Sequence, residues 1–281
     1  MDLVLLIISC HTCSRKLMKI FATVIFILFS FTLISNAEPS AEKIRFDKDI
    51  FGNFKKEADN GDVDSMWTVG NAYLYGNYSH LEQNISEGIK WHLKAANMGG
   101  FLSQYTLFEV YASGEYVPQD LVEAAKWLSK VGEQMQPLGQ LSIGIRFFEG
   151  NGVNKDDTEA VRWFRKAAEK GIAEGQSRLC GAYALGKGVS MDYKEAAKWA
   201  RKSAEQGDKV GQSFLAFFYA NGYGVAEDYV LSYMWYNILA ANGVEKGRED
   251  KNIISEKMTK EQIAEAQKMS REWMAKHSEK E

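Results

Sequence analysis

Apolar positions recur along the chain with a period of 36 residues. Five tryptophans set the register, and each has a small residue three positions before it and five positions after it. In the third segment these neighbours are Ala160 and Ala168 around Trp163. Residues at these spacings lie on one face of a helix, so each segment predicts a helix that packs closely through its tryptophan. The structural anchors predicted in this way are Trp91, Trp127, Trp163, Trp199 and Trp235.

Polar residues at fixed distances mark the ends of these helices. Seven positions before each tryptophan stands Asp or Asn, and in the first four segments Glu follows three residues later. This spacing predicts a reciprocal capping box at the start of the helix. Glycine stands eight positions after four of the five tryptophans, where it suits a left-handed helix stop. Met135 is the exception in the second segment.

A second helix is expected ahead of each tryptophan helix. It carries an aromatic residue with a small residue three positions earlier, as in Gly144 and Phe147. Phe108 breaks this rule, which predicts a wider helix pair in the second segment. The two helices are joined by turns such as GNGVNKD at 150–156, whose glycines permit positive φ. The first segment has two extra residues in its turn, so the loop at 76–84 is expected to bulge.

Five helix–turn–helix units in tandem predict a solenoid, because each unit buries its apolar face on the next. The expected fold is all-α, a right-handed superhelical α/α solenoid of about five 36-residue repeats. Thr259 and Gln262 form a capping box that begins a terminal helix. The expected repeats are 59–98, 99–134, 135–170, 171–206 and 207–243, with capping helices in 38–58 and 244–281.

These residues resemble a known repeat. The fourth unit shows its pattern, with Tyr183, Gly186-Lys187-Gly188-Val189, Asp192, Glu195-Ala196 and Trp199. The chain resembles the Sel-1-like repeat family, a relative of the tetratricopeptide repeat, over about 61–243. The resemblance implies a protein that binds a protein or peptide partner on a concave face lined by the first helix of each unit. The candidate partner groove carried over in this way comprises Trp67, Asn71, Leu102, Tyr105, Glu109, Leu141, Ile145, Phe148 and Phe217.

The groove positions differ in character along the chain. The first three units carry large apolar residues, and Leu74 and Leu138 belong to them as well. The fourth unit offers only Glu174, Ser177 and Gly181, and the fifth adds Val210 and Ser213. An exposed apolar stripe would indicate a partner site. The alternative is that tight superhelical curvature buries these side chains against neighbouring helices.

The N-terminus is typical of a secretory signal peptide covering 1–37. The run at 20–34 is uncharged and mostly apolar, and it follows Lys19. Ser35 and Ala37 are the small residues expected before a cleavage site, so cleavage after Ala37 is expected. An uncleaved anchor is the alternative, and Met18 is a possible true start. We therefore expect a periplasmic or secreted protein with no membrane span after cleavage.

Charge and chemistry narrow the function further. The net charge is -3, which argues against nucleic-acid binding. His80, His92 and His277 lack metal-ligand spacing, and Cys180, the one cysteine left after cleavage, stands at a buried packing position. The Ser40-x-x-Lys43 match lacks the other motifs of a β-lactam site. The sequence therefore predicts a scaffold of the cell envelope without catalytic, metal or cofactor residues. The alternatives are a secreted factor acting on a host cell and, less favoured, an enzyme acting on the cell wall or on β-lactams.

Overall fold

The computed structural model describes residues 41–278, and every regular element in this range is an α-helix. The expected signal peptide and its cleavage site lie outside the described residues. The chain forms two compact units: one extends to Gln136 and includes Gly152–Asn154, and the other comprises Pro137–Asn151 and the chain from Lys155 onward. The division falls at the one repeat boundary where Met135 replaces the usual glycine.

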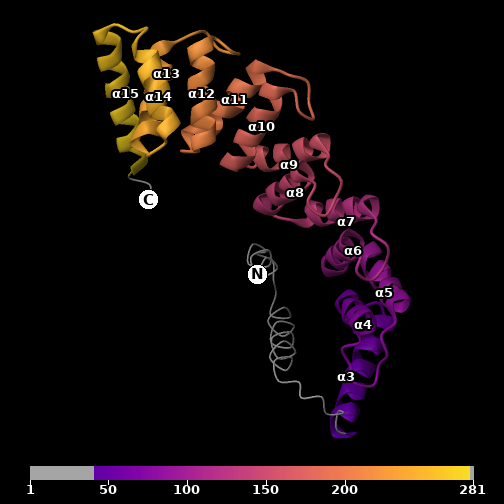
Figure 1. Ribbon diagram of the computed structural model, residues 1–281. Helices are drawn as coiled ribbons and strands as arrows, with labels where there is room; N and C mark the ends of the chain where they lie inside the picture. Colours follow the sequence, from indigo (N-terminus) through magenta and orange to yellow (C-terminus); the bar gives the residue numbers. More distant parts are fainter. Residues whose placement is uncertain (1–40, 279–281) are drawn as a thin grey trace. The chain divides into compact units, whose positions relative to one another are not determined.

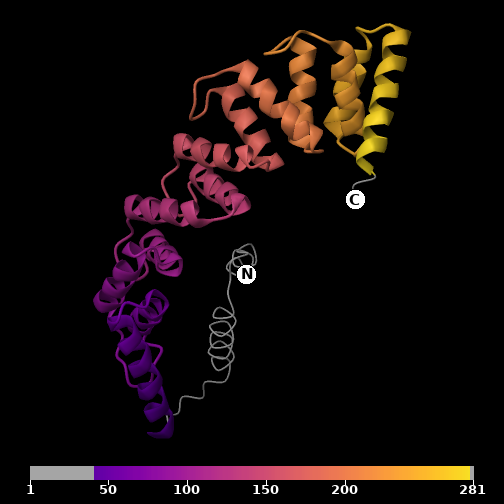
Figure 2. The same cartoon turned by 180° about the vertical axis from the view of Figure 1, so that it is seen from behind.

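The helices of each unit pack in chain order (Figure 1). In the second unit, α13 packs against α12, α14 and α15, and these helices lie side by side when seen from the front and from behind (Figures 1 and 2). The first unit holds α3 (Ala41–Asp59), α4 (Val63–Tyr75), α5 (Ile85–Asn97), α6 (Phe101–Ser113) and α7 (Leu121–Gln134). The second unit holds α8 (Pro137–Glu149), α9 (Asp157–Glu169), α10 (Ala173–Leu185), α11 (Tyr193–Glu205), α12 (Lys209–Asn221), α13 (Tyr229–Ala241), α14 (Glu245–Ser255) and α15 (Lys260–Ser278).

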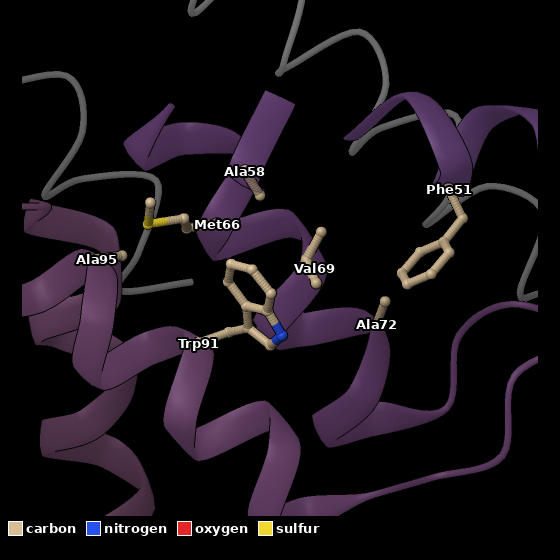
Figure 3. Packing of buried hydrophobic residues seen from close by; sticks show 7 residues of the cluster. All are labelled: Phe51, Ala58, Met66, Val69, Ala72, Trp91 and Ala95. Atoms are coloured by element: carbon tan, nitrogen blue, oxygen red, sulfur yellow. The ribbon is translucent and has the colours of Figure 1, made fainter. Parts of the chain in front are cut away.

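The five tryptophans of the 36-residue repeat are all buried. In the first unit, the indole ring of Trp91 lies beside Met66 and Val69 of α4, and Phe51 and Ala58 of α3 belong to the same apolar cluster (Figure 3). Burial of such large apolar surfaces is the main stabilising contribution over the described residues, where Cys180 is a free cysteine.

Basic side chains cover four of these tryptophans. In the third repeat the guanidinium of Arg162 lies 4.3 Å from the ring centre of Trp163, and the ammonium of Lys166 lies 4.6 Å from it. Trp91, Trp127 and Trp199 have lysines in the same arrangement. Trp235 instead packs edge-on against Trp273 of α15. The charged stretch around each tryptophan therefore shields the ring by cation–π contact while its charged groups stay near solvent.

Of the two hydrogen bonds predicted for each capping box, only the one accepted by the Asp or Asn side chain is formed. Asp156 accepts hydrogen bonds from the backbone N–H groups of Thr158 and Glu159, and the equivalent residues of the other four repeats also cap their helices. The prediction of a reciprocal box is wrong for these helices, because the N–H of Asp156 donates to the carbonyl of Phe147. Glu159 instead pairs with Arg162 at 2.9 Å. The fully reciprocal box occurs at Thr259 and Gln262.

The two helices of a repeat pack through residues of complementary size. Gly144 of α8 faces Phe164 of α9 so closely that an added Cβ atom would lie 2.7 Å from the ring. Phe108, which departs from the small-residue rule, packs against the turn of the following repeat. Its ring is fully buried, and a Cβ atom on Gly152 of the following turn would lie 3.0 Å from it.

The turns between helices contact the preceding repeat through their second glycine. An added Cβ atom on Gly224 would lie 1.9 Å from the carbonyl oxygen of Tyr193, at the start of α11. Gly188 has the same relation to the carbonyl oxygen of Asp157, at the start of α9. No side chain can be accommodated at such a distance, so these glycines allow backbone to touch backbone between successive repeats.

Gly222 and Gly224 allow this contact to be measured, because both have a φ of 68° in the same turn. An added Cβ atom on Gly222 meets nothing closer than 3.6 Å. We expect Gly222→Ala to cost about 1 kcal/mol through its left-handed backbone alone, and Gly224→Ala to cost at least about 3 kcal/mol because the clash is added. Urea denaturation of both variants tests this, and equal losses of stability would contradict the proposed contact.

His92 is a second buried group with a measurable consequence. It is fully buried, its Nδ1 atom lies 3.3 Å from Ser103 Oγ, and Nε2 has no hydrogen-bond partner. Burial lowers the pKa of His92 from 6.5 to about 4. The unfolded chain therefore binds a proton that the folded chain rejects between these pH values. The stability due to neutral His92 is complete above pH 6.5 and is lost as the pH falls towards 4.

We expect His92→Phe to remove this part of the pH dependence. The chain already contains the same arrangement, since Gly144 accommodates Phe164 as Gly70 accommodates His92. The free energy of unfolding of the unaltered protein should fall by roughly 3 kcal/mol more than that of the variant between neutral pH and pH 4. Parallel curves for the two proteins, measured by denaturation across this range, would show that His92 does not titrate in this way.

Candidate functional site

A pocket of about 440 Å³ opens between α10 and α12 of the second unit, and residues of α8 and α9 complete it. This α10–α12 pocket has the size of a typical ligand site. Val210 and Leu185 on its wall are more than half exposed, at 53% and 63%. Its larger apolar residues are Phe148, Val161, Phe164, Leu185, Val210 and Phe214.

Small residues of the fourth repeat create this hollow. Ser177, Gly181 and Ala182 of α10 form its wall, whereas the first helix of the third repeat has Leu141 and Ile145 at the positions of Ser177 and Gly181. An added Cβ atom on Gly181 would meet only the ring of Phe214, at 3.7 Å. The missing side-chain volume on α10 therefore leaves the aromatic rings of the flanking helices in contact with the pocket.

The pocket also has charged residues in its lining, which are Asp157, Glu174, Arg178, Lys187 and Asp208. Arg178 pairs with Glu174 at 2.8 Å, and its guanidinium lies 5.6 Å from the ring centre of Phe164. The ammonium of Lys155 lies 5.2 Å from the ring centre of Phe148 and 3.8 Å from a carboxylate oxygen of Asp157. The surface left for a ligand therefore combines apolar side chains with these charged groups.

A second pocket of about 320 Å³ lies between α12 and α14. Val210 and Phe214 line both pockets, so α12 forms a shared wall between them. Phe217 and Tyr236 add aromatic surface to this α12–α14 pocket, and burial raises the pKa of the Tyr236 hydroxyl well above its usual value. Lys246 at its edge pairs with Asp250 at 2.9 Å. The two pockets together are called the α12 groove below.

The groove residues predicted in the first unit line neither of these two pockets. Trp67 is half-buried and donates its ring N–H to Thr106 Oγ1 at 3.2 Å. The ring of Tyr105 packs on Phe108. Leu74 is fully buried, which excludes it from a surface. Asn71 and Leu102 are half-buried and Glu109 is exposed.

The predicted groove residues of the second unit divide between core and site. Phe148 lines the α10–α12 pocket and Phe217 lines the α12–α14 pocket. Ile145 is half-buried. The prediction for Leu141 is corrected, since it is 4% exposed and lines neither pocket. Its equivalent in the fourth repeat, Ser177, is 2% exposed but contributes to the wall of the α10–α12 pocket.

Several site residues were missed from the sequence. Phe164 lies in α9, the second helix of its repeat, whereas the resemblance places the groove on the first helices. Leu185 is the last residue of α10. The signal that could have found them is the run of small residues in the fourth repeat, which includes Ser177, Gly181 and Ala182. A gap of volume in one helix exposes the large residues around it.

Other chemistry was sought in the described residues. They include no group of His, Cys, Asp and Glu that could hold a metal ion. Within the same range, no helix combines the length and apolar character that a membrane span requires. Cys180 is buried as its position predicts, and burial raises the pKa of its thiol far above its usual value.

The repeated helix pairs define an all-α repeat solenoid, and comparison with known proteins gives its family. The family model described as Sel1 repeat matches 63–100, 102–134, 137–172, 173–208 and 210–244. These segments make up more than half of the chain, which therefore belongs to the Sel1 repeat family. Sel1 repeat proteins generally mediate protein–protein interactions, and the family is generally non-catalytic.

Solved structures are also similar to the chain. One is c5321, a protective antigen present in uropathogenic Escherichia coli strains and described as displaying an SLR fold, with 31% identity and a TM-score of 0.52. The match covers 81% of this chain but 48% of c5321, so the chain spans about half the length of that protein. A Sel1 repeat protein from Oxalobacter formigenes has 30% identity over 78% of this chain and 88% of its own, with a TM-score of 0.46. No curated protein sequence matches the chain significantly.

Proposed function

We propose that the chain is a non-enzymatic adaptor that binds a protein or peptide partner in the α12 groove. The observation that carries this proposal is the pair of adjoining pockets whose walls include the exposed side chains of Leu185, Val210 and Phe217. Contiguous apolar surface of this kind is uncommon on a protein without a partner. The family's general role in protein–protein interaction supports the same conclusion.

The proposed adaptor works outside the cytoplasm, in the cell envelope. The support for this is the signal-like sequence at 1–37. A second candidate is a secreted factor that acts on a host cell, and one observation favours it: the related c5321 is described as a protective antigen of uropathogenic strains. Both candidates use the same groove and differ in where the partner is found.

One capture experiment tests the groove and separates the two candidates. The tagged full chain is recovered from the periplasmic and envelope fractions and from the culture medium after exposure to host cells, and bound proteins are identified by mass spectrometry. We expect Leu185→Asp combined with Val210→Asp to abolish the interaction, because charges in an apolar pocket lose hydration without gaining a partner. Both changes are at exposed positions, so the fold should persist.

The matched control carries Val122→Asp and Met191→Asp. These side chains are 71% and 61% exposed and line neither pocket. This variant should capture the partner as the unaltered chain does. Capture that survives the change at Leu185 and Val210, with the fold intact by circular dichroism, would refute the groove as the partner site. A partner found only with host cells would favour the second candidate.

A further inference from the structure

We propose that the first unit binds an arginine-containing basic segment of a partner protein. The docking surface, called the acidic face below, comprises Tyr75, Glu109, Glu115 and Tyr116. These residues come from the end of α4, from α6 and from the turn that follows α6. The inference does not rest on the α12 groove, which belongs to the second unit. It adds the second docking surface that an adaptor needs in order to join two proteins.

Positive charge is segregated between the helices of the first unit. The chain has no Lys or Arg at 57–89 and none at 95–125, and these stretches contain α4, α6 and the turns that follow them. The basic residues of the same repeats lie on α5 and α7, where lysines cover the tryptophan rings. Over 41–136 the chain has 14 acidic and 9 basic residues. The first helices therefore present negative charge, which is complementary to a cationic partner.

The acidic face combines aromatic rings with carboxylates. The rings of Tyr75 and Tyr116 pack edge-on, with their centres 5.6 Å apart, and Tyr75 is 43% exposed. Glu109 and Glu115 are both exposed. Within the described part of the chain, no Lys or Arg side chain forms an ion pair with either glutamate. Both carboxylates are therefore available to a basic group from outside.

The local field of the acidic face favours a cation. Burial raises the pKa of the Tyr75 hydroxyl, and the neighbouring Tyr116, Glu115 and Glu109 raise it further. Burial and the side chain of Glu115 also raise the pKa of Tyr116. Surroundings that oppose a negative charge on these phenols stabilise a positive charge beside them. The helices add to this effect, because Tyr75 is the last residue of α4 and Glu115 lies just beyond the end of α6, where the helix dipole is negative.

Arginine suits this face better than lysine does. Its planar guanidinium stacks on aromatic rings and donates paired hydrogen bonds to carboxylates, whereas the lysine ammonium acts as a point charge. The chain already contains such a contact, since the guanidinium of Arg162 lies 4.3 Å from the ring centre of Trp163. One helical turn before Tyr75, Asn71 has a buried side-chain oxygen without a hydrogen-bond partner. The same side of α4 therefore also holds an acceptor for a further N–H group.

The test measures the binding of labelled hexa-arginine, hexa-lysine and hexa-glutamate peptides to the full chain by fluorescence anisotropy at low salt. We expect hexa-arginine to bind, hexa-lysine to bind several-fold more weakly and hexa-glutamate not to bind. Salt should weaken the binding of hexa-arginine, because exposed charges are screened beyond about 10 Å at 0.1 M ionic strength.

The protein side has a matched pair of variants. Glu109→Gln combined with Glu115→Gln removes two charges at exposed positions and keeps the shape of both side chains. It should weaken the binding of hexa-arginine about fivefold or more, because two ion-pairing groups are lost. The control is Glu87→Gln combined with Glu123→Gln, which removes the same net charge from α5 and α7, where both glutamates already pair with lysines. The control should bind hexa-arginine as the unaltered chain does.

The aromatic part of the face is tested separately. Tyr75→Leu keeps an apolar side chain at the end of α4 and removes the ring. We expect it to weaken the binding of hexa-arginine about threefold and to narrow the preference for arginine over lysine, because guanidinium stacking on an aromatic ring is lost.

The outcomes separate this inference from the proposed function. The acidic face is overturned if hexa-arginine does not bind, or if the variant at Glu109 and Glu115 binds it as the control does with the fold intact by circular dichroism. Equal affinity for hexa-arginine and hexa-lysine would overturn the choice of arginine. None of these results changes partner capture through Leu185 and Val210, which tests the α12 groove. Conversely, the Leu185→Asp and Val210→Asp variant should still bind hexa-arginine, and loss of this binding would place the peptide in the second unit and overturn the inference.

Discussion

Stacking of the repeats in the second unit depends on one constraint, which is direct backbone contact at the second glycine of each turn. Gly188 meets the carbonyl of Asp157 and Gly224 meets that of Tyr193, at distances that exclude any Cβ atom. Each turn is thereby held against the start of the second helix in the preceding repeat. Asp157 and Lys187 both line the α10–α12 pocket. The contact between Gly188 and the carbonyl of Asp157 therefore also brings these two lining residues close together.

The candidate site results from a local departure from the repeat. Most repeats fill the space between their helices by matching a small residue with a large one, as Gly144 does with Phe164. The fourth repeat instead has the small residues Ser177, Gly181 and Ala182 along the wall of its pocket. Its pocket is therefore a consequence of missing side-chain volume within an otherwise regular array.

Most of the fold could be predicted from the sequence, because its signals are local. The Asp cap, the turn glycines and the tryptophan each act within a single repeat. The same signals recur along the chain because the repeats follow one another at 36-residue spacing. The site was predictable only in part. Register alone places Phe148 and Phe217 at the pockets, together with Glu174, Ser177, Gly181, Val210 and Ser213. The burial of Leu141 and the exposure of Phe164 to a pocket depend instead on how neighbouring helices fill space. The reciprocal capping box failed for a similar reason, since the carbonyl of the preceding aromatic residue competes for the same N–H.

The account can be tested most directly by hydrogen–deuterium exchange of the full chain with and without its captured partner. If the hollow of the fourth repeat is the binding site, exchange should slow in α10 (Ala173–Leu185) and α12 (Lys209–Asn221), whose residues line it. Protection confined to α4 and α6, which carry Trp67 and Tyr105, would contradict the account and would indicate that the partner binds the first unit.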